Sequence, residues 1–431
     1  MYFISFLTVV FSQAFSWVFS VFNNIIVVRT LGPEGQGVIA LVVSFSGILA
    51  TLGNLGLNWS NTYWAVRKKT MADTIFSNSM VFSLILILAV FILLKGRFID
   101  FTNPFIDANF FRIVLLAIPF MVFTQLNQSL LLGLQKMMPY NLISVSRLFF
   151  LTLGFSFFLV ILKKTLVFAV WVWFYVAVLI CFFSVYLVIN QLKGFRLKID
   201  IRAFTDSVKI GVRVFSLGLI SLLIMRFDFF ILRYFKGVES VGYYSIAVLF
   251  TEVLLFIPQI LGQLIMPRGS MQDSGSLILA LRVNRIAVVY SLVLGVAMIL
   301  FIRPVLLILF GSSFLSSYRS FILLVPGIIA LNCTSTICSY INGKEGYPKQ
   351  MILAALLAFI INILFDLLLI PKYGIDGAAV ASSIAYFAST CFCLAYFYWQ
   401  KKITAKDLLV LQRNDLILLK EKFIRVLKIK T

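Results

Sequence analysis

The sequence predicts an all-α polytopic membrane protein, with about twelve transmembrane helices in two parallel six-helix bundles. The first observation is composition: 61% of the 431 residues are hydrophobic and 12% are charged, whereas about a quarter of the residues in a soluble domain are charged. The second is length, because twelve spans of about 20 residues leave only short loops and one tail. The third is an internal repeat that relates the two halves. A soluble globular protein, a disordered chain and a secreted disulfide scaffold are therefore excluded.

Breaks in hydropathy at glycine, proline and charged clusters delimit the helices. The first helix is expected to be a mature transmembrane helix, since it begins at Met1 without a basic segment and stays apolar for about 27 residues. In chain order, the predicted helices are 2–28, 36–62, 74–94, 109–133, 139–162, 165–190, 208–233, 241–266, 281–302, 318–342, 348–370 and 375–399.

The two halves repeat one another at an offset of about 205 to 210 residues. The segment Arg29–Gly37 resembles Arg233–Gly242, and Gly133 with Pro139 resembles Gly343 with Pro348. An even number of helices separates the copies, so both bundles have the same orientation, an arrangement that places a substrate between them. The predicted domains are an N-terminal six-helix bundle at 1–190, a cytoplasmic linker at 191–207, a C-terminal six-helix bundle at 208–400 and a basic amphipathic cytoplasmic tail at 401–431.

Loop charge predicts the orientation. Basic residues are about twice as frequent in the loops and tail on the side of the two termini as on the opposite side, which favours both termini in the cytoplasm. The tail alternates apolar residues with basic ones and carries too many charges to span the bilayer. We expect it to form an interfacial helix on the anionic leaflet, with binding of a partner protein as the alternative.

The net charge of +21 indicates attraction to polyanions. Nucleic acid is the generic candidate, but an anionic leaflet and a phosphate-bearing substrate suit a multispan protein better. The sequence has no histidine, and its five cysteines lie in apolar runs without metal-site spacing. It also lacks a phosphate-binding loop of the Gly-x4-Gly-Lys-Ser/Thr type and a hydrolase elbow. We therefore expect no enzyme activity, no catalytic residue, no cofactor, no metal and no nucleic-acid partner.

Three arginines within predicted helices point to an anionic substrate. Arg147, Arg213 and Arg226 would each cost about 2.5–3.5 kcal/mol at the bilayer midplane, so they should face a cavity or a partner. Guanidinium groups bind oxyanions such as diphosphate through bidentate hydrogen bonds. The alternative for Arg147 and Arg213 is that they extend to the nearby cytoplasmic interface.

Three acidic residues within helices are candidates for ion coupling: Asp228, Glu252 and Asp366. Each could exchange a proton or a sodium ion during transport, or could simply pair with a nearby arginine or polar group. Arg226 and Asp228 are two residues apart and so lie on different faces of a regular helix. Either each has its own partner or the helix is broken there.

Uncharged polar residues form stripes at three- and four-residue spacing and suit a hydroxyl-rich substrate. The alternative is helix packing through hydrogen-bonding side chains. The candidate binding amides are those of Asn24, Gln125, Gln128 and Asn332.

Several segments resemble the polysaccharide-biosynthesis flippases, the Wzx-type members of the multidrug/oligosaccharidyl-lipid/polysaccharide (MOP) exporter superfamily. The resemblance covers nearly the whole chain, and the order and spacing of the motifs are more specific than any one of them. The motifs are Val28–Gly37 with Leu52–Leu57, Asp228 through Gly242–Ser245 with Glu252 and Pro258, Asn342–Lys344 with Pro348, and Pro371–Ala379.

This resemblance implies a two-lobed fold like that of the multidrug and toxic compound extrusion (MATE) transporters. It also implies that the protein moves an undecaprenyl-diphosphate-linked oligosaccharide from the cytoplasmic to the periplasmic leaflet of the bacterial inner membrane by alternating access. The product would be a surface polysaccharide such as the O-antigen of lipopolysaccharide, a capsule or an exopolysaccharide. Its implied partners are the lipid-linked sugar, the bilayer, a polysaccharide polymerase and a chain-length regulator.

Two other functions are alternatives to the export of a lipid-linked sugar. A MATE-like multidrug or cation antiporter would share the fold but should have an acidic cavity, whereas the spans here carry comparable numbers of arginines and acids. A polymerase or ligase acting on the same lipid-linked sugars would need a sizeable periplasmic loop, and the predicted outer loops are short.

Overall fold

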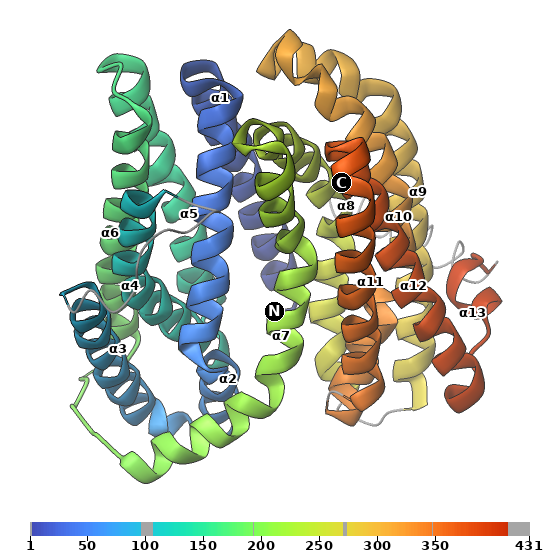
Figure 1. The fold of residues 1–431 in the computed structure, drawn as a ribbon. Coiled ribbons are helices and arrows are strands. Elements are labelled where there is room, and N and C mark those ends of the chain that lie inside the picture. Colours follow the sequence, from blue (N-terminus) through green and yellow to red (C-terminus); the bar gives the residue numbers. More distant parts are fainter. Residues whose placement is uncertain (1, 96–106, 193, 270–273, 347, 413–431) are drawn as a thin grey trace, which may run out of the picture. The chain divides into compact units, whose positions relative to one another are not determined.

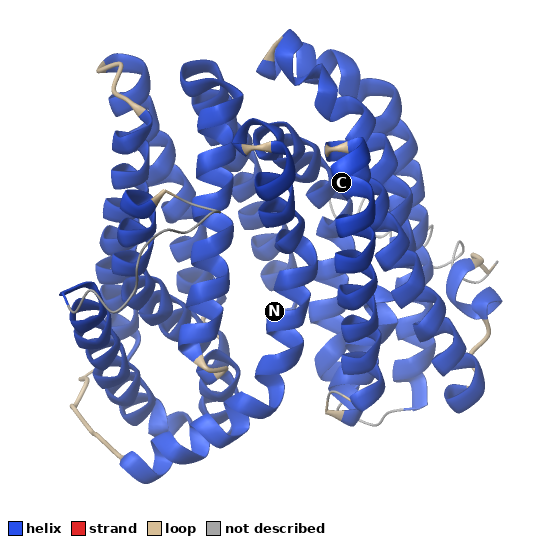
Figure 2. Cartoon of the chain, viewed as in Figure 1, coloured by secondary structure: helices blue, strands red, loops and turns tan. Residues whose placement is uncertain are grey.

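The computed structural model describes residues 2–95, 107–192, 194–269, 274–346 and 348–412. Over these residues the regular secondary structure is helical, joined by loops and turns and without strands, as Figures 1 and 2 show. The main helices are α1 (Tyr2–Asn54), α2 (Leu57–Arg67), α3 (Ala72–Lys95), α4 (Ala108–Gly133), α5 (Met137–Phe155), α6 (Leu166–Leu192), α7 (Ile201–Lys236), α8 (Val238–Gly269), α9 (Ser274–Phe310), α10 (Ser316–Glu345), α11 (Lys349–Tyr373), α12 (Ile375–Lys401) and α13 (Ala405–Leu409).

The all-helical membrane fold is confirmed. Ten helices in the described part of the chain are long and apolar enough to cross a membrane. The difference from the predicted twelve has two sources. The first two predicted spans are joined in α1, and the predicted span 208–233 lies in α7, which is not among the ten.

A kink at Gly32 joins the first two predicted spans. Gly32 has a φ of 69°, a left-handed conformation that favours glycine, and Pro33 follows it inside the helix. The second segment does not reach residue 62 as predicted. It ends at Asn54, because Leu55 and Gly56 both have positive φ values, 51° and 75°, and α2 begins after this turn.

Two other helices begin earlier than predicted. The carboxylate of Asp200 accepts a hydrogen bond from the backbone N–H of Ala203 at 3.0 Å and caps α7, which begins at Ile201. Helix α9 begins at Ser274, before the predicted start at residue 281. Hydropathy reports only the part of a helix that lies in the hydrocarbon region, whereas both helices continue beyond it.

The chain forms two compact units. Unit 1 comprises Met1–Ile246, Leu306–Ser317 and Leu367–Ala378, and unit 2 comprises Ala247–Val305, Tyr318–Asp366 and Ala379–Thr431. The core of unit 1 is made of aliphatic side chains such as Val42, Val114 and Leu131, each fully buried. The core of unit 2 includes Ile337, Phe397 and Leu408.

Two glycines of the sequence repeat occupy comparable places. A β-carbon on Gly133 would overlap Ala65 and the carbonyl oxygen of Thr62 in unit 1. A β-carbon on Gly343 would overlap the carbonyl oxygen of Met266 in unit 2. Each glycine therefore permits a close helix contact.

The tail begins with the short helix α13, which packs on the other helices of unit 2. The side chain of Leu408 is fully buried, and the guanidinium Nη1 of Arg285 donates to the carbonyl oxygen of Asp407 at 2.7 Å. The predicted interfacial helix falls mainly on residues 413–431, which lie outside the described residues.

Candidate functional site

A cavity of about 240 Å³ lies inside unit 1, between α4, α5 and α6. Its polar lining combines amides, hydroxyls and one arginine, with no acidic side chain among the lining residues. The lining residues are Met121, Thr124, Gln125, Gln128, Ile143, Ser144, Arg147, Leu151, Trp173, Val176, Ala177 and Ile180.

Helical spacing gathers the polar groups of this cavity. On α4, Thr124 and Gln128 are one turn apart, with Gln125 beside them, and on α5 Ser144 and Arg147 are one turn apart. The Gln128 Nε2 donates to the Ser144 Oγ at 2.9 Å and joins the two helices. The candidate amides of Gln125 and Gln128 therefore line a cavity.

The side chain of Gln125 is held by a hydrogen bond from α1. Its Oε1 accepts a hydrogen bond from the Asn54 Nδ2 at 2.8 Å, and Asn54 is itself buried at the end of α1. With its oxygen engaged, the Gln125 amide presents N–H donors to the cavity wall.

Arg147 is exposed even though it lies in a membrane-spanning helix. Many protein atoms surround it, but the open cavity leaves its side chain accessible. Within the part of the chain that the structure describes, its guanidinium has no ion-pair or hydrogen-bond partner. All five of its N–H donors are thus available to a ligand.

The sequence did not single out Ser144 and Trp173 as site residues. Ser144 lies one turn before Arg147, and this spacing was a usable signal. Trp173 is nearly buried and presents an aromatic surface to the cavity from α6. No sequence feature distinguishes it from the neighbouring aromatic residues of that helix.

Asn24 belongs to a different polar cluster of unit 1. Its Nδ2 donates to the carbonyl oxygen of Ser20 at 2.7 Å, and its Oδ1 accepts from the Gln36 Nε2 at 2.7 Å. The same Gln36 nitrogen donates to the Ser245 Oγ at 3.0 Å. This buried link joins both segments of α1 to α8, and Gln36 was not predicted to take part in a site.

Arg226 and Asp228 also lie in unit 1, away from the cavity lining. Helix α7 is continuous through both residues, so the predicted alternative of a broken helix is wrong. The Arg226 guanidinium lies 5.6 Å from the centroid of the Phe229 ring. Asp228 is buried, and its Oδ1 accepts from the backbone N–H of Phe229 at 2.9 Å. Arg213 lies in α7, but its side chain is outside the described residues.

The remaining candidates lie in unit 2. Asn332 is fully buried, and its Nδ2 donates to the carbonyl oxygen of Leu254 and to the Ser291 Oγ, both at 2.9 Å. It ties α10 to α8 and α9. Glu252 is half-buried on α8, and Asp366 is fully buried on α11.

Two other cavities open in unit 1 where α4 and α6 begin, and Asp107 lines both. One, of about 490 Å³, also contains Arg112, and the other, of about 230 Å³, contains Glu34 and Arg233. Charges of both signs line these two cavities, whereas the cavity at Arg147 carries a positive charge alone.

Comparison with known proteins places this geometry in context. A family model described as polysaccharide biosynthesis protein matches residues 4–271. An uncharacterized membrane protein of Methanocaldococcus jannaschii is 29% identical over 174 residues, which cover 39% of this chain and 34% of that protein. The chain therefore spans about a third of the length of this curated relative.

Solved structures share the fold. The lipid II flippase MurJ, in an inward closed conformation, matches with a TM-score of 0.76 at 17% identity, over 97% of this chain and 93% of that one. An inward-facing MATE family multidrug resistance transporter matches with a TM-score of 0.70 at 15% identity, over 90% and 94%. A MOP superfamily transporter from Pyrococcus furiosus, whose title reports reversed polarity of the binding pocket, matches with a TM-score of 0.65 at 16% identity, over 93% and 95%.

Proposed function

The chain belongs to the polysaccharide biosynthesis protein family, and on that basis we propose that it is a flippase for a lipid-linked oligosaccharide. Its substrate is an oligosaccharide joined to undecaprenol through diphosphate. The protein moves the sugar and diphosphate from the cytoplasmic to the periplasmic leaflet by alternating access, for assembly of a surface polysaccharide. A polymerase and a chain-length regulator act on the product.

The observation that carries this proposal is the accessible Arg147 guanidinium in a cavity lined by amides and hydroxyls. Placing an arginine inside a membrane bundle costs free energy unless a partner binds its charge, and the N–H donors of Arg147 are available to such a partner. A diphosphate supplies the matching acceptors, because guanidinium and phosphate form bidentate, charge-assisted hydrogen bonds. The amides of Gln125 and Gln128 and the hydroxyl of Ser144 suit the hydroxyl groups of a sugar.

The cavity is smaller than a complete oligosaccharide, so it accommodates only part of the substrate. At about 240 Å³ it lies below the range of about 300–1,000 Å³ that is usual for pockets enclosing a drug-sized ligand. The lipid tail stays in the bilayer, where it meets no polar group. We therefore assign the cavity to the diphosphate and the adjoining sugar. Arg213 and Arg226 are further candidates for phosphate binding, whereas the amide nitrogens of Asn24 and Asn332 are engaged in hydrogen bonds within their own units.

The membrane potential favours export of such a substrate. A diphosphate carries about two negative charges, and each charge gains about 2.3 kcal/mol per 100 mV on leaving an inside-negative compartment. This drive does not require ion exchange. If transport is also coupled to an ion, the candidate ion-binding residues are Asp228, Glu252 and Asp366. Asp366 is the least exposed of the three.

A multidrug or cation antiporter is the alternative function within the same fold. It requires acidic groups where the substrate binds, and the cavity at Arg147 has none among its lining residues. The positive charge thus favours an anionic substrate over an organic cation.

Deletion of the gene, followed by mass spectrometry of lipid-linked oligosaccharides, tests the proposal. We expect the undecaprenyl-diphosphate-linked oligosaccharide to accumulate on the cytoplasmic face, surface polysaccharide to be lost, and the intact gene to restore both. Unchanged lipid-linked sugar in a strain without a second flippase would overturn the proposal. A gain in sensitivity to organic cations in the same strain would then support the antiporter.

A further inference from the structure

The connection from α6 to α7 presents a regular alternation of apolar and basic side chains. Leu197, Ile199 and Ile201 expose 58%, 57% and 74% of their surface. Arg196 and Lys198 alternate with them and are exposed as well. Three aliphatic side chains with this exposure are unfavourable in water and favourable at the surface of a bilayer.

Hydrogen bonds to α3 fix this connection in place. The backbone N–H of Lys198 donates to the Ser77 Oγ at 3.0 Å. The backbone N–H of Asp200 donates to the Asn78 Oδ1 at 3.1 Å, and the Asn78 Nδ2 donates to the carbonyl oxygen of Asp200 at 2.9 Å. The backbone that carries the alternating apolar and basic side chains is therefore fixed to α3.

The first turns of α7 continue the same surface. Helix α7 has 36 residues and is about 54 Å long, whereas the hydrocarbon core is about 30 Å thick, so part of the helix lies outside the core. Figure 1 shows these first turns running across the end of the neighbouring helices before α7 turns along α1. Phe204 and Val208 pack on the core of unit 1.

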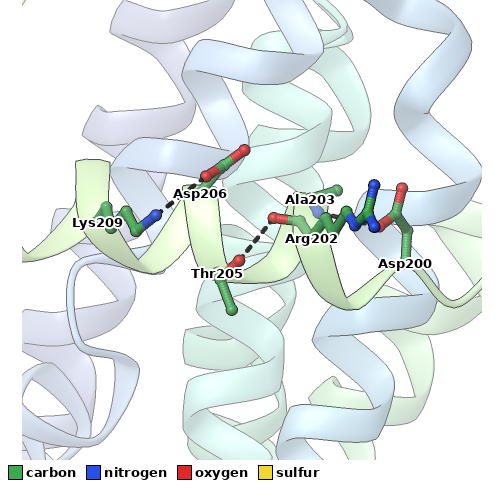
Figure 3. Close-up of polar contacts among 6 residues, drawn as sticks. All are labelled: Asp200, Arg202, Ala203, Thr205, Asp206 and Lys209. Carbon is green, nitrogen blue, oxygen red and sulfur yellow. Dashed lines mark hydrogen bonds and ion pairs between the residues drawn. The ribbon is translucent and has the colours of Figure 1, made fainter.

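The other faces of these turns are exposed and amphipathic. At 3.6 residues per turn, Ile201 and Val212 lie within about 20° of each other, and Arg202 and Lys209 follow about 60–100° further round the helix. Figure 3 shows this segment, with the Lys209 Nζ 3.6 Å from the Asp206 Oδ1 and the Thr205 Oγ1 donating to the carbonyl oxygen of Arg202 at 2.8 Å. An apolar strip beside a basic strip is typical of helices that lie in a membrane interface.

Helix α2 extends the surface at the same end of unit 1. Gly56, at its start, lies against the backbone of Gly211 in α7. Trp59, Tyr63 and Val66 lie one turn apart along its exposed side, and tryptophan and tyrosine are enriched at membrane interfaces. The exposed basic residues Arg67, Lys68 and Lys69 follow.

The charge of this surface is strongly positive. Over residues 57–69 and 194–212 the sequence has seven basic and two acidic side chains, Asp200 and Asp206. Both acids are already engaged, Asp200 as the cap of α7 and Asp206 with Lys209. The other basic groups of the surface, all exposed, are Arg67, Lys68, Lys69, Arg196, Lys198 and Arg202.

We propose that residues 57–69 and 194–212 form a docking surface for anionic phospholipids of the leaflet at this end of unit 1, which the loop charges assign to the cytoplasm. The aliphatic and aromatic side chains enter the acyl boundary, and the basic groups bind the phosphates of lipid headgroups. This surface is distinct from the cavity at Arg147, and the lipids that it binds are not the transported substrate.

Native mass spectrometry of the full chain in nanodiscs tests this proposal. The discs contain phosphatidylcholine in excess with phosphatidylglycerol as the anionic lipid, and the lipids retained on the released protein are counted. The test variant is Arg196→Gln/Lys198→Gln/Arg202→Gln, which keeps the backbone hydrogen bonds. The matched control is Lys95→Gln/Lys163→Gln/Lys164→Gln, which removes three exposed basic residues from the opposite end of unit 1.

We expect the wild type and the control to retain phosphatidylglycerol selectively and the test variant to lose it. Each basic group near a membrane surface contributes about a factor of five, so three removals should weaken binding of the anionic lipid about a hundredfold. Equal loss in the test variant and the control would overturn the proposal. So would equal retention of both lipids by the wild type, which would assign the surface to apolar contact alone. An unchanged unfolding temperature of the variant in lipid-free detergent verifies that it is folded.

Discussion

Gly37 of α1 and Gly242 of α8 lie in reciprocal backbone contact. A β-carbon on Gly37 would overlap the carbonyl oxygen of Val238, and one on Gly242 would overlap that of Pro33. Each overlapped carbonyl belongs to the residue four positions before the opposite glycine. The two glycines end the repeated segments Arg29–Gly37 and Arg233–Gly242, so the repeat supplies both halves of one contact.

Gly37→Ala should separate α1 from α8. Forcing a methyl group into a packed backbone contact destabilises a protein by about 1–3 kcal/mol, more than the gain of about 1 kcal/mol from the better helix former. We expect a lower unfolding temperature for the purified protein. Gly47→Ala, in the same helix but with open space around it, is the control and should not lower it. Equal behaviour of the two variants would contradict the proposed contact.

Arg147→Ala should abolish transport in cells, because it removes the positive charge from the cavity of unit 1. Arg147→Lys should retain part of the activity, since it keeps the charge but not the bidentate geometry. Surface polysaccharide in a deletion strain that expresses each variant at equal level is the measurement. Lys164→Ala, an exposed basic residue outside this cavity, should restore the wild-type amount. Full activity of Arg147→Ala would remove this residue from the site.

Leu408→Ala should loosen α13 from unit 2. The Leu408 side chain is fully buried in the core of unit 2, and truncation of such a residue costs about 2–5 kcal/mol. Val410→Ala, two residues later and 51% exposed, should have little effect. Thermal unfolding of both variants measures the difference, and a similar shift for the two would argue against docking of α13.

Acid should weaken the start of α13 through Asp407. Hydrogen bonds from the Thr404 hydroxyl, at 2.6 Å, and from the Thr404 backbone N–H, at 3.0 Å, hold the pKa of the Asp407 carboxyl below its usual value. Because the folded-state pKa is the lower one, this contribution to stability is present above the unfolded pKa of about 4 and is lost as pH falls through the folded value. Asp407→Asn should lower the unfolding temperature at neutral pH, and its difference from the wild type should disappear in acid. A difference independent of pH would exclude this role.

The helical fold and the order of its spans could be predicted from the sequence, because hydropathy reports which segments leave water. The ends of helices could not, since they depend on backbone conformation and packing. Leu55 and Gly56 end a helix inside an apolar run, and no charge marks the place. Arg285 lies nearly buried within α9 and binds a backbone carbonyl of the tail, a tertiary contact that hydropathy does not report.

The candidate site was predicted in part. Gln125, Gln128 and Arg147 share one cavity because their spacing places them on facing sides of α4 and α5. Asn24 and Asn332 have the same chemistry, but their amides are used in hydrogen bonds within their own units. Periodicity gives the face of a helix that is polar, and it does not say whether another helix or open space lies opposite.

The second segment of α1 runs without interruption from Gly37 to Asn54, about 26 Å, and both of its ends abut the α7–α8 hairpin within unit 1. Gly37 meets Gly242, and Gly56, just past the turn, meets Gly211. Because close backbone contacts hold this helix near both of its ends, a change at either contact would turn it about the other contact as one rigid unit.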